Sequence, residues 1–163
     1  MTKFIFKKGQ RIGGWTLGKC LGKGGNAAVW RVMSNGEHVA LKILTGHHTE
    51  RSEPFQRFQF EVGLLERLNG TLGVMPFKSA FLPLRLDAET PAWLAMPIAH
   101  KLEDQLKKGS SLKNIVEAIA AYAKTLAKLH EQQIYHRDIK PENLFWLGSV
   151  DVSSQPQKYR RKR

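Results

Sequence analysis

Alternating apolar and polar positions in the first third of the chain predict an antiparallel sheet. Three runs follow this pattern, at residues 15–21, 28–33 and 38–44. The last two runs flank a short polar stretch that contains Asn35-Gly36, a dipeptide that favours a two-residue hairpin turn. We therefore expect three consecutive strands that pair as a meander.

The apolar spacing changes to three and four residues in two later segments, which predicts two helices. Residues 52–69 form the first, and its apolar members are Phe58, Val62, Leu65 and Leu68. Ser52 is placed to cap its first turn, and Gly70 follows its end. Residues 111–131 form the second, capped by Ser111, with a stripe of Leu112, Ile115, Ala118, Ile119, Tyr122, Leu126 and Leu129.

The segment between the two helices, residues 71–100, returns to short apolar runs separated by prolines. Two further strands are expected there, around residues 75–81 and 93–96. Residues 149–163 are polar and basic and show no apolar period. We expect this tail to be disordered, because it buries too little apolar surface to offset the entropy of ordering it.

The composition fits a globular protein and disfavours several other classes. The chain has 163 residues, of which 42% are hydrophobic and 25% charged. No apolar run approaches the ~18 residues that a membrane span needs, and the first eight residues are too charged for a signal sequence. A single cysteine, Cys20, excludes an intrachain disulfide, and the six histidines lack metal-ligand spacing. We expect a cytoplasmic protein that does not associate with membranes.

The net charge of +12 is concentrated at the two ends of the chain. Residues 1–36 carry seven Lys or Arg and no acid, and residues 158–163 carry five more. The remaining residues, 37–157, hold fourteen charges of each sign. Nucleic-acid-binding proteins spread basic residues along one face, so this distribution argues against nucleic-acid binding as the main function.

A glycine-rich loop joins the first two predicted strands. It contains Gly22, Lys23, Gly24, Gly25 and Asn26. Glycines let backbone N–H groups approach phosphate oxygens without a Cβ in the way, so such a loop suits a nucleotide. An ordinary flexible hairpin fits the same residues equally well. A second strand follows the glycines where a dinucleotide-binding motif would need a helix.

Lys42 lies in the otherwise apolar strand 38–44, and Glu61 follows on the first predicted helix. Glu61 precedes Val62 of the apolar stripe, so its side chain is placed near the side of the helix that faces the sheet. The two residues are therefore able to form a buried ion pair that faces a nucleotide. The alternatives are a solvent-facing strand lysine and a purely structural salt bridge.

The most informative segment is His136-Arg137-Asp138-Ile139-Lys140-Pro141-Glu142-Asn143. Asp138 and Asn143 are five residues apart across a proline-containing loop, which lets the loop aim a carboxylate at a substrate hydroxyl and an amide oxygen at a metal. Lys140 adds positive charge where phosphate charge develops. A string of this composition and order has little chance of arising by accident.

Taken in order, these segments resemble the protein kinase family over about residues 12–147. The glycine loop, Val39-Ala40-Leu41-Lys42, Glu61 and the segment from His136 to Asn143 match its motifs. The resemblance implies an α+β fold with an antiparallel-sheet upper lobe and a helix over residues 1–96. Residues 97–148 would hold the hinge, at 97–101, and an incomplete helical lower lobe with the catalytic loop. Lys140 is similar to the lysine of Ser/Thr kinases.

The resemblance also implies roles for individual residues. The glycine loop and Lys42, paired with Glu61, would hold the phosphates of ATP. The adenine would be contacted by Val29, Ala40, Phe145, Met96 and the backbone of Ile98. Asp138 would accept the proton of the substrate hydroxyl, Lys140 would neutralise the γ-phosphate, and Asn143 would ligate Mg²⁺.

Two departures from the family pattern stand out. Ala27 occupies the position of the third glycine of the loop, which is a mild change. No Asp-Phe-Gly follows Asn143, and Asp151 is the only acidic residue left in that stretch. We therefore expect a chain truncated before this motif, for which a frameshift, a premature stop and a gene-model error are equivalent explanations.

The sequence thus predicts a Ser/Thr protein kinase that uses ATP and Mg²⁺, in a form with little or no activity. The alternative is a non-catalytic kinase-like module that binds nucleotide or protein. A basic nucleic-acid-binding protein is a third and weaker hypothesis. The protein substrate is not predicted. The apolar stripe of the helix at 111–131 predicts self-association or chaperone binding.

Overall fold

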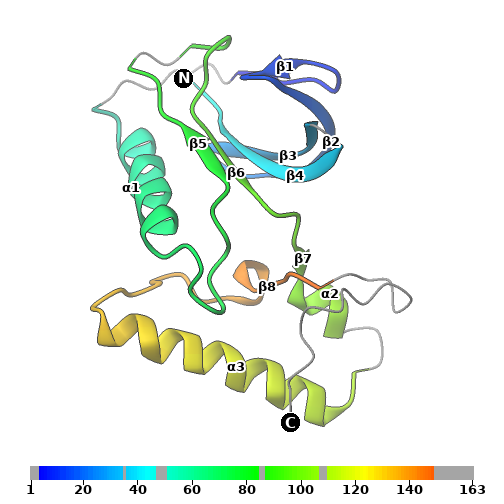
Figure 1. The fold of residues 1–163 in the computed structure, drawn as a ribbon, viewed down its shortest axis with the longest axis vertical. Helices are drawn as coiled ribbons and strands as arrows, with labels where there is room; N and C mark the ends of the chain where they lie inside the picture. The colour runs from blue at the N-terminus through cyan, green and yellow to red at the C-terminus, as the bar shows by residue number, and fades with distance from the viewer. Residues whose placement is uncertain (1–3, 35, 47–50, 85–86, 107–109, 149–163) are drawn as a thin grey trace.

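The computed structural model describes residues 4–34, 36–46, 51–84, 87–106 and 110–148. A curved sheet with one long helix beside it occupies the first two thirds of the chain, and a second long helix crosses below it (Figure 1). The predicted disordered tail, residues 149–163, lies outside the described residues. Within the described ranges, no helix combines the length and the apolar character that a membrane crossing requires.

The sheet is antiparallel and six-stranded, in the order β1-β2-β3-β4-β6-β5. Its strands are β1 (Arg11–Ile12), β2 (Trp15–Lys23), β3 (Ala27–Ser34), β4 (Glu37–Leu44), β5 (Ser79–Phe81) and β6 (Trp93–Met96). The predicted meander is confirmed, because β2, β3 and β4 pair consecutively. Ser34 pairs with Glu37, so two residues make the turn as the sequence predicts, and Gly36 adopts a φ of +79° there.

Each face of the sheet carries its own apolar core. On one face, Leu17, Val32, Leu41 and Ile43 are almost fully buried, and Phe6 from the N-terminal segment covers them. On the other face, Leu44, Ala92 and Leu94 pack against residues of the first helix. Because side chains alternate between the faces of a strand, β4 contributes to both cores. This arrangement fixes which side chains of β4 face the helix.

The first helix, α1 (Glu53–Arg67), buries Phe55, Phe58 and Val62 against the sheet. Ser52 holds the predicted N-cap position, but its side chain makes no capping hydrogen bond, so that part of the prediction is wrong. The Ser52 carbonyl oxygen instead accepts the N–H groups of Phe55 and Gln56 at 3.1 and 3.0 Å. Pro54 in the first turn needs no hydrogen-bond partner for its nitrogen.

The strand predicted at 75–81 is shorter than expected, because β5 begins only at Ser79. Pro76 has no N–H to donate, and the N–H of Phe77 is taken by Oδ1 of Asn69 at 3.1 Å. These residues therefore form a loop after α1 instead of extending the sheet. The strand predicted at 93–96 is confirmed as β6.

The second helix, α3 (Leu112–Glu131), matches its prediction closely. The Ser111 side chain caps it by accepting the N–H of Asn114 at 3.3 Å. Before it lie β7 (His100–Lys101) and the short α2 (Leu102–Leu106), and after it lie the 3₁₀ turn η1 (Pro141–Asn143) and β8 (Phe145–Trp146). β7 pairs with β8, so the last two residues of the predicted hinge belong to a small separate sheet.

Candidate functional site

The glycine loop closes the hairpin between β2 and β3. Gly24 donates its N–H to the carbonyl oxygen of Ala27 at 2.8 Å. A Cβ on Gly22 or Gly25 would meet nothing within 4 Å, and one on Gly24 would meet only that carbonyl, at 3.5 Å. The packing of this chain therefore does not require these glycines. Their bare backbone instead leaves room for another molecule to approach the loop closely.

Lys42 and Glu61 form the predicted ion pair. The Lys42 Nζ donates to both carboxylate oxygens of Glu61, at 2.6 and 2.7 Å. Lys42 lies on β4, which is paired on both sides, so it is not a lysine on a sheet edge. The side chains keep 26% and 38% of their surface exposed, so the pair is only partly buried, where the sequence predicted a buried one. That exposure leaves the ammonium group accessible to a ligand.

The loop and the lysine line one open cavity of about 430 Å³, within the size range of small-molecule sites. Its walls are residues 22–27, Val29 and Lys42. Val29 pairs with Lys42 across β3 and β4, which places both side chains on the same face of the sheet. The cavity thus combines the backbone of the glycine loop, the apolar side chains of Ala27 and Val29, and two lysines, Lys23 and Lys42.

The residues expected around adenine are spread over several elements and do not gather around one cavity. Ala40 and Met96 pair across β4 and β6, and Ile98 follows in the segment without helix or strand. Phe145 lies on β8 and is 49% exposed. Of the five residues, only Val29 lines the cavity described above. Leu21, directly before Gly22, is 43% exposed and does not line this cavity.

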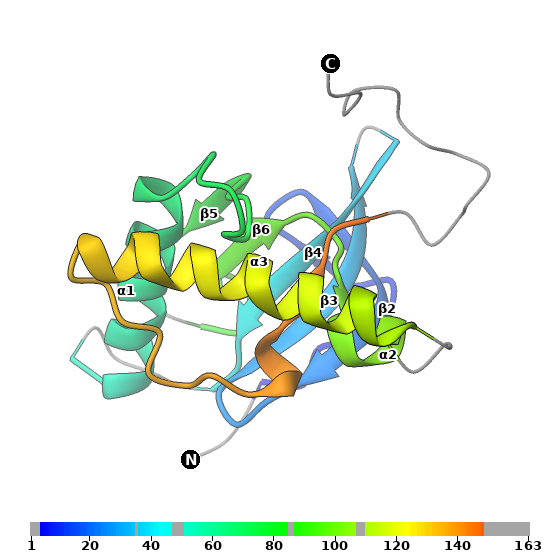
Figure 2. The same ribbon diagram turned by 90° about the horizontal axis from the view of Figure 1, so that it is seen from below.

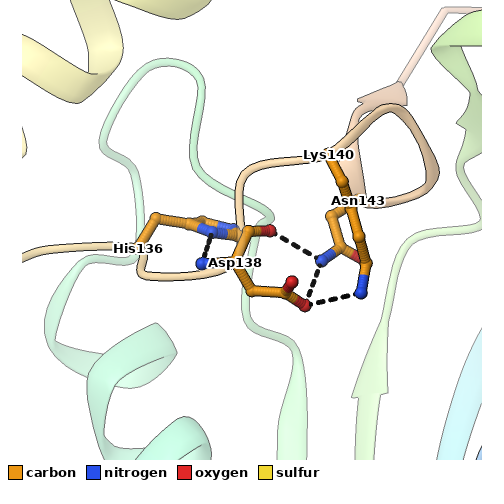
Figure 3. Close-up of polar contacts among 4 residues, drawn as sticks. All are labelled: His136, Asp138, Lys140 and Asn143. Atoms are coloured by element: carbon orange, nitrogen blue, oxygen red, sulfur yellow. Dashed lines mark hydrogen bonds and ion pairs between the residues drawn. The ribbon is translucent and has the colours of Figure 1, made fainter.

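The segment from His136 to Asn143 folds so that Asp138, Lys140 and Asn143 meet (Figure 3). Asn143 Nδ2 donates to the backbone oxygen of Asp138 at 2.9 Å and to its Oδ2 at 2.8 Å. The Lys140 Nζ lies 2.9 Å from the same carboxylate oxygen. The turn η1 brings Asn143 back towards Asp138. The structure therefore brings together the three residues that the sequence singled out in this segment.

Backbone strain accompanies this arrangement. Arg137, directly before Asp138, has a φ of +60°, a left-handed conformation that side chains other than glycine adopt at a cost. The N–H of Asp138 donates to Nδ1 of His136 at 3.4 Å. The conformation of Arg137 thus turns the chain so that Asp138 points at Lys140 and Asn143.

The Lys140 and Asn143 side chains that bond to Asp138 hold the pKa of its carboxyl below the ordinary value. The same contact raises the pKa of Lys140. A depressed folded-state pKa means that the carboxylate is present at neutral pH and that its contacts are lost as pH falls through that pKa. Asp138 is consequently a weak base, suited to orienting a hydroxyl for transfer.

Replacing Lys140 with alanine is expected to raise the pKa of Asp138 towards that of a free aspartate. The substitution removes the largest cause of the depression, and the Asn143 bond remains. A ¹³C NMR titration of the carboxyl group measures the midpoint. Lys113→Ala, on the exposed side of α3, is the control and should leave the midpoint unchanged. Equal midpoints in the wild type and Lys140→Ala would show that the contact does not form in solution.

The site offers an incomplete set of ligands for Mg²⁺. Because Asn143 Nδ2 is committed to Asp138, its Oδ1 is the atom left for a metal. The Asp138 carboxylate is shared with Lys140. Among the described residues, no three His, Cys, Asp or Glu side chains gather into a metal-binding group. Magnesium sites usually include one or two carboxylates, so the described residues do not fit a tightly held ion.

Comparison with known proteins identifies the relatives of this chain. Serine/threonine-protein kinase Pkn1 of Myxococcus xanthus is 31% identical over 147 residues, which cover 84% of this chain and 20% of that protein. CBL-interacting serine/threonine-protein kinase 20 of Arabidopsis thaliana is 28% identical over 147 residues, covering 85% and 31%. The chain therefore spans between about a fifth and a third of the length of these relatives.

The fold agrees with these relatives. A double mutant of the PknI kinase domain of Mycobacterium tuberculosis superposes with a TM-score of 0.65 at 19% identity, covering 90% of this chain and 58% of that one. The protein kinase domain family matches residues 15–152, which include the glycine loop, the ion pair and the catalytic loop. This chain belongs to the protein kinase domain family.

Proposed function

We propose that this chain forms the ATP-binding part and the catalytic loop of a Ser/Thr protein kinase. The observation that carries the proposal is the cavity shared by the bare glycine loop and Lys42, whose ammonium group Glu61 holds in place. An ammonium and a loop backbone without Cβ atoms in the way, brought together in one cavity, suit the phosphates of a nucleotide. The Ser/Thr preference rests on Lys140 and on the relatives named above.

In this proposal, each residue acts by position and charge. Lys42 binds the phosphates next to the nucleoside, while Glu61 fixes its ammonium group. Residues 22–26 cover the phosphates with their backbone. Asp138 orients the acceptor hydroxyl, and Lys140 offsets the charge of the transferred phosphate. Mg²⁺, where bound, would supply further charge neutralisation through Asn143.

The adenine contacts are the least constrained part of the proposal. Val29 borders the phosphate cavity, and Ala40 and Met96 lie in register on neighbouring strands. Ile98 lies on the segment that connects β6 to β7, and Phe145 lies on β8, which pairs with β7 (Figure 1). An adenine bound between these residues would reach from Val29, at the edge of the cavity, towards β6.

A non-catalytic nucleotide- or protein-binding module is the second candidate function. The sequence favours it in one respect, because no Asp-Phe-Gly follows Asn143. A nucleotide-binding module would also bind ATP through Lys42 and would differ from the kinase only in turnover, whereas a protein-binding module would not need ATP. The cytoplasmic location stays a prediction.

Lys42→Ala is expected to weaken ATP binding about tenfold or more. A loss of this size corresponds to the usual contribution of one hydrogen bond to a charged group. Isothermal titration calorimetry on the 163-residue chain measures the affinity. Lys19→Ala removes an exposed lysine from β2, which β3 separates from β4, and is the matched control. Equal losses in both variants would assign the binding to the general positive charge of the chain. An unchanged affinity in Lys42→Ala would refute the proposal.

Magnesium is expected to change the affinity for ATP very little, because no three His, Cys, Asp or Glu side chains gather among the described residues, and the Asp138 carboxylate is already paired with Lys140. The same titration is repeated with and without Mg²⁺. A strong enhancement by the metal would contradict this expectation and would place another ligand, such as the carboxylate of Asp151, at the site.

A further inference from the structure

A row of exposed side chains crosses the first four strands of the sheet. Arg11 pairs with Thr16 across β1 and β2. Thr16 pairs in turn with Met33 on β3, and Met33 pairs with His38 on β4. Residues that lie opposite each other on antiparallel strands point to the same face, so these four side chains lie next to one another. At the usual strand spacing, the row is about 14 Å long.

Arg31 adds a second guanidinium group beside this row. It lies on β3 two residues before Met33, so both side chains point to the same face, about 7 Å apart along the strand. All of these side chains are exposed, and Met33 keeps 55% of its surface accessible. We call this set the basic face. Its members are Arg11, Thr16, Arg31, Met33 and His38.

The basic face lies on the side of the sheet against which α1 packs, but at the other end of the strands. Val32 and Val39 alternate with Met33 and His38, and they are buried in the core on the opposite side. The helix α1 packs near Leu44, at the far end of β4. Figure 2 shows that the hairpin joining β3 to β4 extends away from α1. The helix therefore leaves the basic face uncovered.

The described residues leave the charge of the basic face unpaired. No described carboxylate forms an ion pair with Arg11 or Arg31, and no described group hydrogen-bonds to the His38 side chain. Residues 1–36 contain seven Lys or Arg and no acid. Glu37 directly precedes His38, so its side chain points to the other face, and its carboxylate is paired with Lys78. The basic face therefore attracts a partner of opposite charge.

The side chains of the basic face fit a peptide better than a nucleic acid. Met33 lies between Thr16 and His38, where its flexible apolar side chain is placed to contact an apolar residue of a partner. Single-stranded nucleic acids are held by aromatic rings on which their bases stack. In the strands β1 to β4, the Trp side chains, Trp15 and Trp30, pack into the opposite core, and these strands contain no Phe or Tyr.

We propose that the basic face binds an acidic segment of a partner protein. Carboxylates of that segment pair with Arg11 and Arg31, and an apolar side chain between them packs on Met33. Guanidinium groups suit this role because each can hold a carboxylate through two parallel hydrogen bonds. The proposal uses the strands β1 to β4 alone and depends neither on nucleotide binding nor on turnover.

Fluorescence anisotropy of the 163-residue chain with a labelled Glu-Glu-Leu-Glu-Glu peptide tests the charge contacts. The double variant Arg11→Gln/Arg31→Gln should raise the dissociation constant about fivefold, since it removes two exposed charge pairs. Arg67→Gln/Lys124→Gln removes two exposed basic residues from α1 and α3 and is the matched control. Circular dichroism checks that the fold of each variant is unchanged. An equal loss in the control would assign the binding to the net charge of +12 and would overturn the proposal.

The apolar contact is tested with a second peptide, Glu-Glu-Ser-Glu-Glu. The wild type should bind this peptide more weakly than the leucine peptide, because the serine leaves Met33 without an apolar partner. Met33→Gln removes the apolar surface at similar length and should bind both peptides equally. A leucine preference that persists in Met33→Gln would show that the apolar residue does not pack on Met33.

Two further outcomes would overturn the proposal. The first is the absence of any binding of the leucine peptide to the wild type at low ionic strength. The second comes from a deoxythymidine oligomer of the same charge, measured in the same way. If it bound as tightly as the peptide, and Arg11→Gln/Arg31→Gln weakened it equally, the basic face would be a nucleic-acid site and not a peptide site.

Discussion

Incubated with ATP, Mg²⁺ and a Ser/Thr peptide, the 163-residue chain is expected to transfer no detectable phosphate. Asp138, Lys140 and Asn143 are assembled, but transfer also requires a metal held against the phosphates and an acceptor hydroxyl held in line. The described residues contain no group of three His, Cys, Asp or Glu side chains that could hold a metal, and the sequence lacks an Asp-Phe-Gly after Asn143. The loss of positioning alone would raise the activation free energy by ~7–11 kcal/mol, which lowers the rate roughly 10⁵- to 10⁸-fold.

A radiometric assay with the wild type, Asp138→Asn and Asp104→Asn decides this point. Asp104 is an exposed aspartate on α2 and controls for the loss of one negative charge. All three proteins should give the background signal. Transfer by the wild type that only Asp138→Asn abolishes would show that the site is complete, with Asp151 as the remaining candidate to hold the metal.

Leu41→Ala is expected to lower the free energy of unfolding by about 2–5 kcal/mol. Leu41 lies on the central strand β4, is 0% exposed and belongs to the core on the face of the sheet away from α1. The substitution leaves a cavity that neighbours on two paired strands cannot fill. Because small domains are stable by only about 5–15 kcal/mol, this loss is a large share of the total.

Leu84→Ala is the matched control, since the same atoms are removed from a side chain that is 84% exposed. Its effect should stay within about 0.5 kcal/mol. Urea unfolding followed by circular dichroism measures both variants. Equal small effects would mean that the sheet does not carry the packed core described here.

The sequence predicted the elements that have a long periodic pattern. The strands β2, β3 and β4 and the helices α1 and α3 lie where alternation or helical spacing placed them. The two-residue strands β7 and β8 and the five-residue α2 were missed, because such short elements hold no full period. Their pairing joins segments more than forty residues apart, which local patterns do not reveal.

The candidate site was predictable in its residues but not in its geometry. Lys42 and Glu61 are nineteen residues apart, and the apolar patterns around them sufficed to predict their contact. The sharing of one Asp138 oxygen by Lys140 and Asn143 was not foreseen, since it depends on the left-handed backbone of Arg137. A positive φ at an arginine has no signature in the sequence, because most side chains avoid it.

The shortened β5 depends on a side-chain contact that the apolar pattern does not reveal. Oδ1 of Asn69 takes the N–H of Phe77, so this backbone donor is not available to the sheet. Competition for a backbone donor is decided by the folded geometry and not by residue type alone.

The position of bound ATP tests the central claim most directly. In a ¹⁵N NMR titration with ATP, we expect the largest backbone shifts at Gly24, Gly25 and Asn26, together with Lys42. The exposed basic residues Lys7, Lys8 and Lys19 provide the comparison, since a chain of net charge +12 also attracts phosphate without a specific site. Shifts confined to those lysines, with the glycine loop unmoved, would contradict the nucleotide site proposed here.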